Sequence, residues 1–223
     1  MTEPRQARAE VTRRRILDAA VDLFAGAGYG ETGLAEIVKQ AEVTKGAFYY
    51  HFASKEAVAT AIIEDSQSKI VEAANRAASG SAAGLESVIA KTFGIARLVQ
   101  TDRSIRIGKE LARSLTQVSD AGRNAFQVWT ADFIGEVQKA GAQVELLDDV
   151  DPDEVGEAIW VAVLGTDLLS NALADDYSMR LAEVWRVLLR GVVPAESIGY
   201  FQEFVKRAAM RPAHGHPDAA RAQ

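Results

Sequence analysis

Apolar residues recur every three or four positions along most of this chain, which is the spacing of amphipathic helices. No segment alternates strictly between apolar and polar residues with clustered β-branched side chains, as a half-buried strand would. The pattern therefore predicts an all-α protein. The predicted helices cover residues 7–27, 33–40, 44–52, 55–78, 84–100, 102–117, 120–141, 152–174, 178–191 and 196–209.

Local signals mark where several of these helices begin and end. The run Gly28-Tyr29-Gly30 is expected to stop the first helix, and Ser54 is placed to cap the helix that follows it. Asp151 before Pro152 predicts a helix start, because proline is tolerated in a first turn. The serine- and glycine-rich segment 79–84 predicts a connection, and the tail from Arg211 onward lacks apolar periodicity and is expected to be disordered.

Residues 33–52 have the pattern of a helix-turn-helix. The first helix places Leu34, Ile37 and Val38 on one face, and a break follows at residues 41–43. The hydroxyl of Thr44 can cap the next helix, which is short, aromatic and tipped with lysine. Such a second helix is free to enter a DNA major groove, while its phenylalanines at 48 and 52 pack in the core.

Composition narrows the possible classes of protein. The 223 residues are 48% apolar and 25% charged, enough for one domain or for a small domain joined to a larger one. The chain has no cysteine, which excludes disulfides and thiolate sites, and no apolar run approaches a membrane span, so a soluble cytoplasmic protein is expected. The net charge of −6 argues against nucleic-acid binding, but residues 1–60 carry eight basic and eight acidic side chains. This part is therefore neutral and the acidic excess lies beyond it.

A family resemblance now becomes visible over residues 10–57. Its residues are Arg15 to Ala20, Leu23-Phe24, Gly28-Tyr29, Thr32, Ile37, Ala41 to Gly46 and Tyr49 to Glu56, which together resemble the TetR family of transcriptional repressors. The resemblance implies a helix-turn-helix DNA-binding domain at 1–54, a ligand-binding and dimerisation domain at 55–209 and a disordered tail at 210–223. It also implies a homodimer formed by pairing of the helices at 152–174 and 178–191. Two residues depart from the family pattern, since Glu42 stands where glycine is usual and Gly33 where serine or threonine is common.

The DNA-binding residues are nominated partly from helix chemistry and partly from the resemblance. Thr44, Lys45 and the amide of Gly46 lie at a helix amino terminus, which favours phosphate, and Lys45 is long enough to reach a base edge. Gly46 and Ala47 allow close approach to the groove. The resemblance further implies that Tyr49 and His51 bind phosphate, that Lys55 neutralises a neighbouring phosphate, and that Tyr50 contacts DNA or packs on the first helix. The arginines at 13–15 either contact phosphate or form a solvated helix face.

A second resemblance concerns the carboxy-terminal part. The segments 126–133 around Trp129, 168–173, and 181–189 around Trp185 are similar to receptors for γ-butyrolactone and related butenolide or furan autoregulators, which control antibiotic production. This similarity implies a small-molecule ligand, with Trp129 against it and Phe133, Gln127 and Thr166 as further lining or polar partners. Core packing remains the alternative for Trp129, and is the expectation for Trp160 and Trp185.

Two alternatives remain for the function. One is a TetR-like repressor of an efflux or catabolic operon that senses a drug or a lipid. The other is an enzyme, but the three histidines lie in the predicted recognition helix and in the tail, at 51, 214 and 216, and no nucleophile, phosphate loop or metal-ligand spacing accompanies them. No cofactor or metal is expected.

Overall fold

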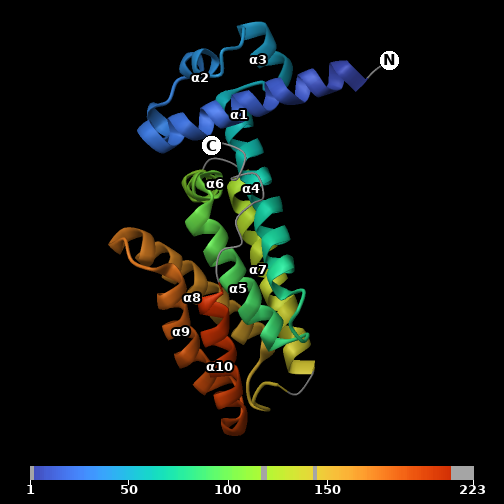
Figure 1. The fold of residues 1–223 in the computed structure, drawn as a ribbon, viewed down its shortest axis with the longest axis vertical. Helices are drawn as coiled ribbons and strands as arrows, with labels where there is room; N and C mark the ends of the chain where they lie inside the picture. The colour runs from blue at the N-terminus through green and yellow to red at the C-terminus, as the bar shows by residue number, and fades with distance from the viewer. Residues whose placement is uncertain (1–2, 117–119, 143–144, 212–223) are drawn as a thin grey trace. The chain divides into compact units, whose positions relative to one another are not determined.

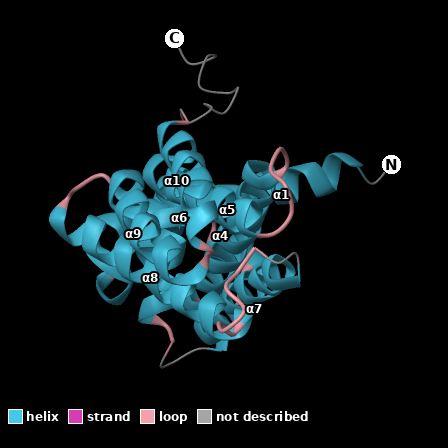
Figure 2. Ribbon diagram, turned by 90° about the horizontal axis from the view of Figure 1, so that it is seen from below, coloured by secondary structure: helices cyan, strands magenta, loops and turns pink. Residues whose placement is uncertain are grey.

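The computed structural model describes residues 3–116, 120–142 and 145–211. Every regular element in these ranges is a helix, which confirms the all-α prediction (Figure 2). The helices are α1 (Glu3–Glu31), α2 (Leu34–Gln40), α3 (Lys45–His51), α4 (Lys55–Ala78), α5 (Leu85–Thr101), α6 (Arg103–Ser114), α7 (Asp120–Ala142), α8 (Pro152–Leu173), α9 (Tyr177–Val192) and α10 (Ala195–Met210). The predicted disordered tail lies outside the described residues from 212 onward.

The chain divides into two compact units. The first contains residues up to Lys69 together with Asp102–Gln127, and the second contains Ile70–Thr101 together with the residues from Val128 onward. The helices α4 and α7 therefore each contribute to both units. The sequence placed all of α4 in the second domain, whereas its first part packs with the amino-terminal helices.

The amino-terminal helices of the first unit enclose a small core. Both α2 and α3 pack against α1, as Figure 1 shows. The side chains of Ile16, Ile37 and Phe48 are completely buried, and Phe52 is nearly so, because the apolar faces of the three helices meet. Phe48 and Phe52 are thus core residues, as the sequence predicted. The expected break at Gly28 is a kink with φ of 84°, after which helical residues resume and end at Glu31.

Helix α6 also belongs to the first unit, where it is capped by Asp102 and contacts α1 and α4. Asp102 caps this helix by accepting hydrogen bonds from the amides of Ser104 and Ile105. The guanidinium of Arg103 donates to Asp22 on α1 at 2.6 Å. At Gly108 the helix comes so close to α4 that a β-carbon would lie 2.3 Å from Ser66 Oγ. A glycine at this position therefore permits the close packing of α6 on α4.

The second unit is built around α5, which is buried along most of its length. It contacts α9 and α10, and α9 also packs against α8 and α10. The indole Nε1 of the fully buried Trp185 donates to Thr92 Oγ1 at 3.0 Å, which satisfies its polar atom inside this core. Trp185 is accordingly a core residue, in agreement with the expectation from the sequence.

A buried ion pair joins α5 to α7. Lys91 Nζ lies 3.5 Å from Glu136 Oε1, and the two side chains are only 7% and 14% exposed. Glu136 also accepts hydrogen bonds from Ser87 at 3.0 Å and from Lys139 at 2.5 Å. Burial alone would raise the pKa of Glu136, but Lys139, Lys91 and Ser87 together lower it below its usual range. The carboxylate is therefore ionised and held in place at neutral pH.

The marked helix starts are found where the sequence placed them. Asp151 accepts a hydrogen bond from the amide of Asp153 at 2.8 Å, and Pro152 occupies the first turn of α8. Ser54 accepts from the amide of Ala57 at 3.1 Å at the start of α4. The segment 79–84 is non-helical between α4 and α5. These local signals were sufficient because each acts within three residues along the chain.

Candidate functional site: a DNA-binding surface and an aromatic cluster

The turn between α2 and α3 is a Schellman motif with glutamate in its left-handed position. The amide of Glu42 donates to the carbonyl of Lys39 at 3.1 Å, and that of Val43 donates to Val38 at 3.2 Å. Glu42 has φ of 53°, a conformation that is usual for glycine and unfavourable for residues with a β-carbon. The turn therefore forms despite the departure from the family pattern, and the backbone at Glu42 carries the conformational cost.

Helix α3 presents its amino-terminal turn and one face to solvent. The hydroxyl of Thr44 accepts a hydrogen bond from the amide of Ala47 at 3.1 Å, so the predicted cap is present. Lys45 and Gly46 are exposed, and the side chains of Tyr49 and Tyr50 are 56% and 72% exposed although both are large and partly apolar. Aromatic residues left in water beside a lysine are typical of a binding surface.

The remaining candidates near α3 have contacts of their own. His51 is half-buried, and its ring lies edge-on to that of Tyr50 at 4.9 Å. Lys55 Nζ donates to the carbonyls of Tyr29 and Thr32, both at 2.8 Å, and lies 4.3 Å from the centre of the Tyr29 ring. These bonds tie the start of α4 to the end of α1. Lys55 thus has a structural role, and a DNA phosphate would have to compete with these two carbonyls for its ammonium group.

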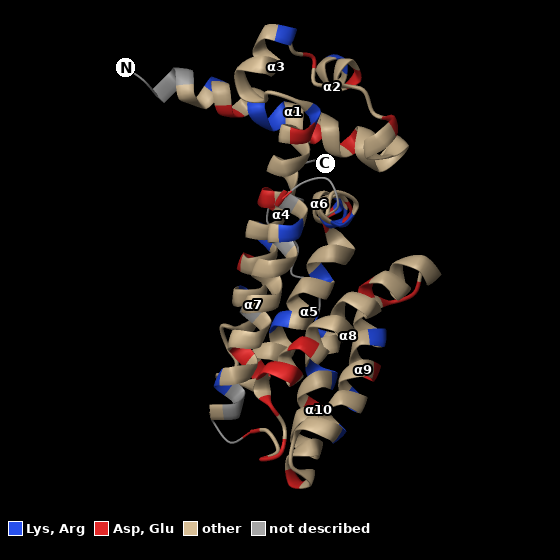
Figure 3. Cartoon of the chain, turned by 180° about the vertical axis from the view of Figure 1, so that it is seen from behind, with Lys and Arg blue, Asp and Glu red and all other residues tan. Residues whose placement is uncertain are grey.

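Each of the three consecutive arginines on α1 has a partner within the chain. The guanidinium of Arg13 lies 5.5 Å from the centre of the Phe52 ring. Arg14 pairs with Asp18 at 3.2 Å on the same helix, and Arg15 pairs with Glu42 in the turn at 3.6 Å. Acidic and basic residues are interspersed along α1 (Figure 3). All three arginines remain partly exposed, so these pairs are weak and exchangeable.

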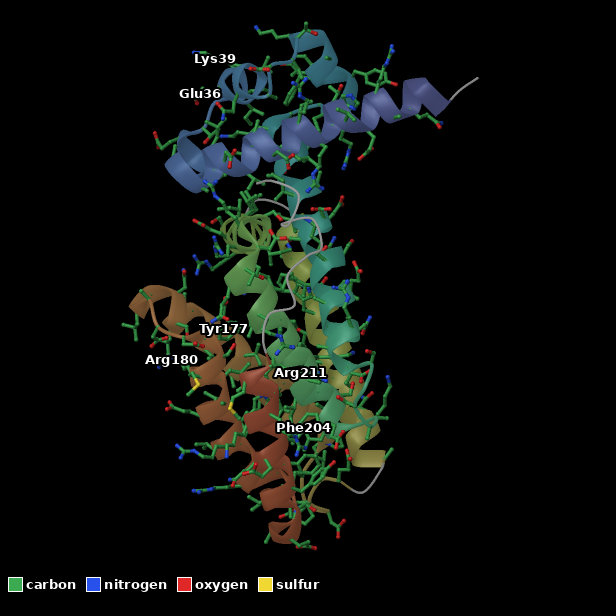
Figure 4. The ribbon with its side chains drawn as sticks, in the orientation of Figure 1. Glu36, Lys39, Tyr177, Arg180, Phe204 and Arg211 are labelled. Atoms are coloured by element: carbon green, nitrogen blue, oxygen red, sulfur yellow. The ribbon has the colours of Figure 1, made fainter. Side chains whose placement is uncertain are left out.

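Residue 33 has no hydroxyl, but its amide is bonded to a neighbouring carboxylate. Glu36, labelled in Figure 4, accepts a hydrogen bond from the amide of Gly33 at 2.7 Å. This bond is the half of a capping box in which the glutamate accepts from the N-cap amide, and it satisfies the amide of Gly33 within the chain. The other half, in which a serine or threonine hydroxyl accepts from the amide of Glu36, is missing because glycine has no side chain.

An aromatic cluster lies in the second unit between α7 and α8. The ring of Phe133 stacks on that of Trp160 at 4.9 Å, and Trp129 meets Trp160 edge-on at 6.0 Å. All three side chains are at least 93% buried. Trp129 and Phe133 on α7 thus both contact Trp160 on α8, for which the sequence predicted core packing. The spacing of the tryptophans along the sequence does not indicate this contact between the two helices.

The other two candidate ligand residues are placed differently. Thr166 is buried on α8, and its hydroxyl donates to the carbonyl of Ala162 on the same helix at 2.6 Å. A hydroxyl bonded in this way can still accept a hydrogen bond from a ligand. Gln127 is exposed and belongs to the first unit. Its predicted role remains a prediction.

Apolar side chains are exposed along one face of α8 and α9. Val161, Leu168, Leu169 and Leu173 on α8 are 50–62% exposed, and Val187 on α9 is 66% exposed. At the start of α9, the buried hydroxyl of Tyr177 donates to the carbonyl of Val163 at 3.3 Å, which fixes the two helices against each other (Figure 4). A large exposed apolar face on rigidly joined helices is typical of an interface between protein chains.

Other kinds of site find no support in the residues that the structure describes. No group of three or more histidine, aspartate or glutamate side chains there could hold a metal ion. Within the same residues, no helix has both the length and the apolar character needed to cross a bilayer.

Two family profiles match the chain. One, described as bacterial regulatory proteins of the tetR family, matches residues 16–62, and the other, described as a tetracyclin repressor-like C-terminal domain, matches residues 82–194. Among curated proteins, the A-factor receptor protein of Streptomyces griseus is 33% identical over 84% of this chain, which spans 66% of that protein's length. The regulator AcrR of Shigella flexneri is 47% identical over 29% of the chain and 30% of its own length.

Solved structures show similarity over the whole fold. CprB from Streptomyces coelicolor is 34% identical, with a TM-score of 0.75, and the match covers 92% of this chain and all of that one. A gamma-butyrolactone receptor described as ArpA-like has 34% identity and a TM-score of 0.74 over 91% of this chain and 98% of its own. CprB in complex with its operator sequence is 35% identical with a TM-score of 0.72, covering 90% of this chain and 97% of that one.

Proposed function

Because this chain belongs to the TetR family of bacterial regulatory proteins, we propose that it is a homodimeric repressor that leaves its operator DNA when it binds a small signalling molecule. The proposed signal is a γ-butyrolactone, butenolide or furan, and the proposed targets are genes of secondary metabolism. The observation that carries this proposal is the similarity of both units to gamma-butyrolactone receptors and CprB, one of which was solved on its operator. The family consists of regulators, so the chain is not an enzyme.

The proposed DNA contacts follow from the exposed face of α3. Lys45 reaches a base edge from the helix tip, and the small residues Gly46 and Ala47 allow the helix to lie deep in the groove. The exposed hydroxyls of Tyr49 and Tyr50 are suited to phosphate oxygens on either side of the groove. The Thr44 hydroxyl accepts the cap hydrogen bond from the amide of Ala47, which orients α3, and its proton remains able to donate to a phosphate oxygen.

The proposed ligand contact is the aromatic cluster of α7 and α8. A lactone or furan ring is flat and mostly apolar, and it can insert beside stacked rings such as Phe133 and Trp160. Trp129 lies one turn before Phe133 on α7, and its indole meets the ring of Trp160 edge-on. The buried hydroxyl of Thr166 offers a polar partner for an oxygen-containing ligand. This combination favours a small, tryptophan-lined site over a broad one lined by carboxylates.

Dimerisation supplies the link between ligand and DNA. The exposed leucines and valines of α8 and α9 can be covered by the same face of a second copy, which is the self-complementary arrangement of a two-fold dimer. Two copies then present two α3 helices to successive major grooves. A ligand that binds more tightly to a different spacing of these helices lowers DNA affinity by its differential affinity for the two states.

The repressor function is tested by a gel shift with the full-length chain and its own upstream DNA. We expect a shifted complex that one member of a panel of γ-butyrolactones, butenolides and furans releases. A complex that resists the whole panel would favour an efflux or catabolic repressor that senses a drug or lipid, in line with the similarity of the amino-terminal part to AcrR. Binding of neither DNA nor any ligand would contradict the proposal.

The role of α3 is tested with a lysine substitution and a matched control. Lys45→Ala removes the exposed lysine at the helix tip, and Lys206→Ala removes an exposed lysine on α10 that is 65% accessible. Loss of a base contact costs about 1–3 kcal/mol of operator affinity. We expect this loss for Lys45→Ala only, measured by fluorescence anisotropy. Equal affinity of the two variants would remove Lys45 from the recognition surface.

A further inference from the structure

We propose that Glu42 acts as an internal competitor for DNA phosphate: it holds the guanidinium of Arg15 and so weakens operator binding and its dependence on salt. This inference rests on the proposed DNA-binding function and adds a residue that tunes it. Glu42 is not a DNA contact itself. Its effect passes through Arg15, on a different helix.

The ion pair connects two elements next to the recognition helix. Arg15 lies on α1, and its guanidinium is 3.6 Å from the carboxylate of Glu42, two residues before the Thr44 cap of α3. The side chains are 56% and 80% exposed. Because both groups remain in water, the pair is weak, and the arginine can exchange one anionic partner for another without a large desolvation penalty.

The backbone fixes the carboxylate in this position. Glu42 and Val43 each donate to a carbonyl in the last turn of α2, so the turn is held at both of its amides. The positive φ of 53° at Glu42 is tolerated although a glycine there would avoid the cost of a β-carbon. A strained conformation combined with a charged side chain beside a binding helix indicates a functional rather than a structural reason for the residue.

The competition follows from the chemistry of the guanidinium. A carboxylate and a DNA phosphate each present two anionic oxygens that the guanidinium fork of arginine can bind. When DNA approaches, Glu42 competes with phosphate for the guanidinium of Arg15, and its carboxylate adds a negative charge close to the DNA backbone. Neutralising Glu42 removes both effects. One additional phosphate contact steepens the slope of log affinity against log salt by about 0.9.

The test compares four proteins by fluorescence anisotropy over a series of salt concentrations. The DNA is an operator recovered from random duplexes by selection with the wild-type chain. Glu42→Gln removes the charge and keeps the side-chain size and the backbone cost, so it does not alter turn stability as glycine would. Glu203→Gln, in the exposed Lys206–Glu203 pair on α10, is the control with the same change in net charge. Arg15→Gln and the double variant complete a cycle, with thermal melts to verify folding.

The expected result is that Glu42→Gln binds operator about two- to tenfold more tightly at low salt, with a salt slope steeper by about two units because each subunit of the dimer gains one phosphate contact. Glu203→Gln should match the wild type. In the Arg15→Gln background the Glu42 substitution should leave the salt slope unchanged and give a smaller gain in affinity, because only the repulsion between the Glu42 carboxylate and DNA is then removed.

Two results would overturn the inference while leaving the repressor function intact. One is equal affinity and equal salt slope for Glu42→Gln and the wild type. The other is a gain in affinity of the same size with and without Arg15, which would show a general charge effect. Failure of the wild type to select or bind any duplex would instead refute the proposed function, and the inference with it.

Discussion

The buried Lys91–Glu136 pair predicts a large loss of stability on Glu136→Gln, although this substitution barely changes the shape of the side chain. Both charged groups are more than 85% buried, and Lys91 lies on the most buried helix of the second unit. Glutamine can still accept the hydrogen bond from Ser87, but it gives the ammonium no counter-charge. The buried ammonium of Lys91 would then lose the carboxylate that lies 3.5 Å from it.

The size of the loss follows from the burial of the pair. Removing one partner of a fully buried ion pair costs about 3–5 kcal/mol. Glu136 retains some exposure, at 14%, so we expect about 2–4 kcal/mol for Glu136→Gln. The matched control is Glu72→Gln on α4, whose pair with Arg76 is 69% exposed on both sides. We expect the control to change stability by less than about 1 kcal/mol.

The assay is equilibrium unfolding in urea at a fixed protein concentration, since dimer stability depends on concentration. Adding Lys91→Met to Glu136→Gln should recover part of the loss, because the buried ammonium that lost the Glu136 carboxylate is then removed. Equal stability of the Glu136→Gln and Glu72→Gln variants would refute the reasoning. So would a double variant that is less stable than Glu136→Gln alone.

The same pair predicts a dependence on pH. The pKa of Glu136 is lowered in the folded protein, so its contribution is fully present above the ordinary carboxyl pKa and is lost as the pH falls through the lowered value. Glutamine does not titrate. The difference in unfolding free energy between wild type and Glu136→Gln should therefore shrink as the pH falls below about 4.5. A difference that grows with acidity would contradict this sign.

Three further predictions concern other elements. Glu42→Gly and Ala174→Gly should each raise the free energy of unfolding by about 0.5–1 kcal/mol in thermal or urea unfolding, because both residues have φ of 53°. A loss of stability in both variants would show that the left-handed backbone is not strained. Gly108→Ala should lower it by about 1–3 kcal/mol, since the new methyl group would lie 2.3 Å from Ser66 Oγ, and an unchanged melting temperature would refute the close packing. Leu173→Glu should convert the dimer to monomers in sedimentation velocity, because this leucine is 62% exposed on the apolar face of α8, and a persistent dimer would place the interface elsewhere.

The sequence predicted well the features that depend on neighbours along the chain. Helix periodicity, the caps at Thr44 and Asp151 and the core positions of Phe48 and Phe52 all act within one or two helical turns. The DNA-binding and ligand roles of the individual residues remain predictions.

Contacts between distant segments were beyond the reach of sequence patterns. Nothing in the spacing of Arg15 and Glu42 indicates that they form an ion pair, because their approach depends on how α1 packs against the turn. A lysine at residue 91 is expected to be solvated, and its burial depends on a carboxylate from another helix. The core position predicted for Trp160 is confirmed, but its stacking on Phe133 could not be predicted because it depends on the approach of α7 and α8.

Operator affinity measured with and without a small lactone tests the central claim most directly. The full-length chain is titrated onto its selected operator by fluorescence anisotropy, alone and with a saturating γ-butyrolactone, butenolide or furan. We predict that one member of the panel raises the apparent Kd by about 5- to 150-fold, the range of common allosteric coupling. Tight, specific DNA binding that no member of the panel alters would contradict the assignment of this regulator to the autoregulator receptors.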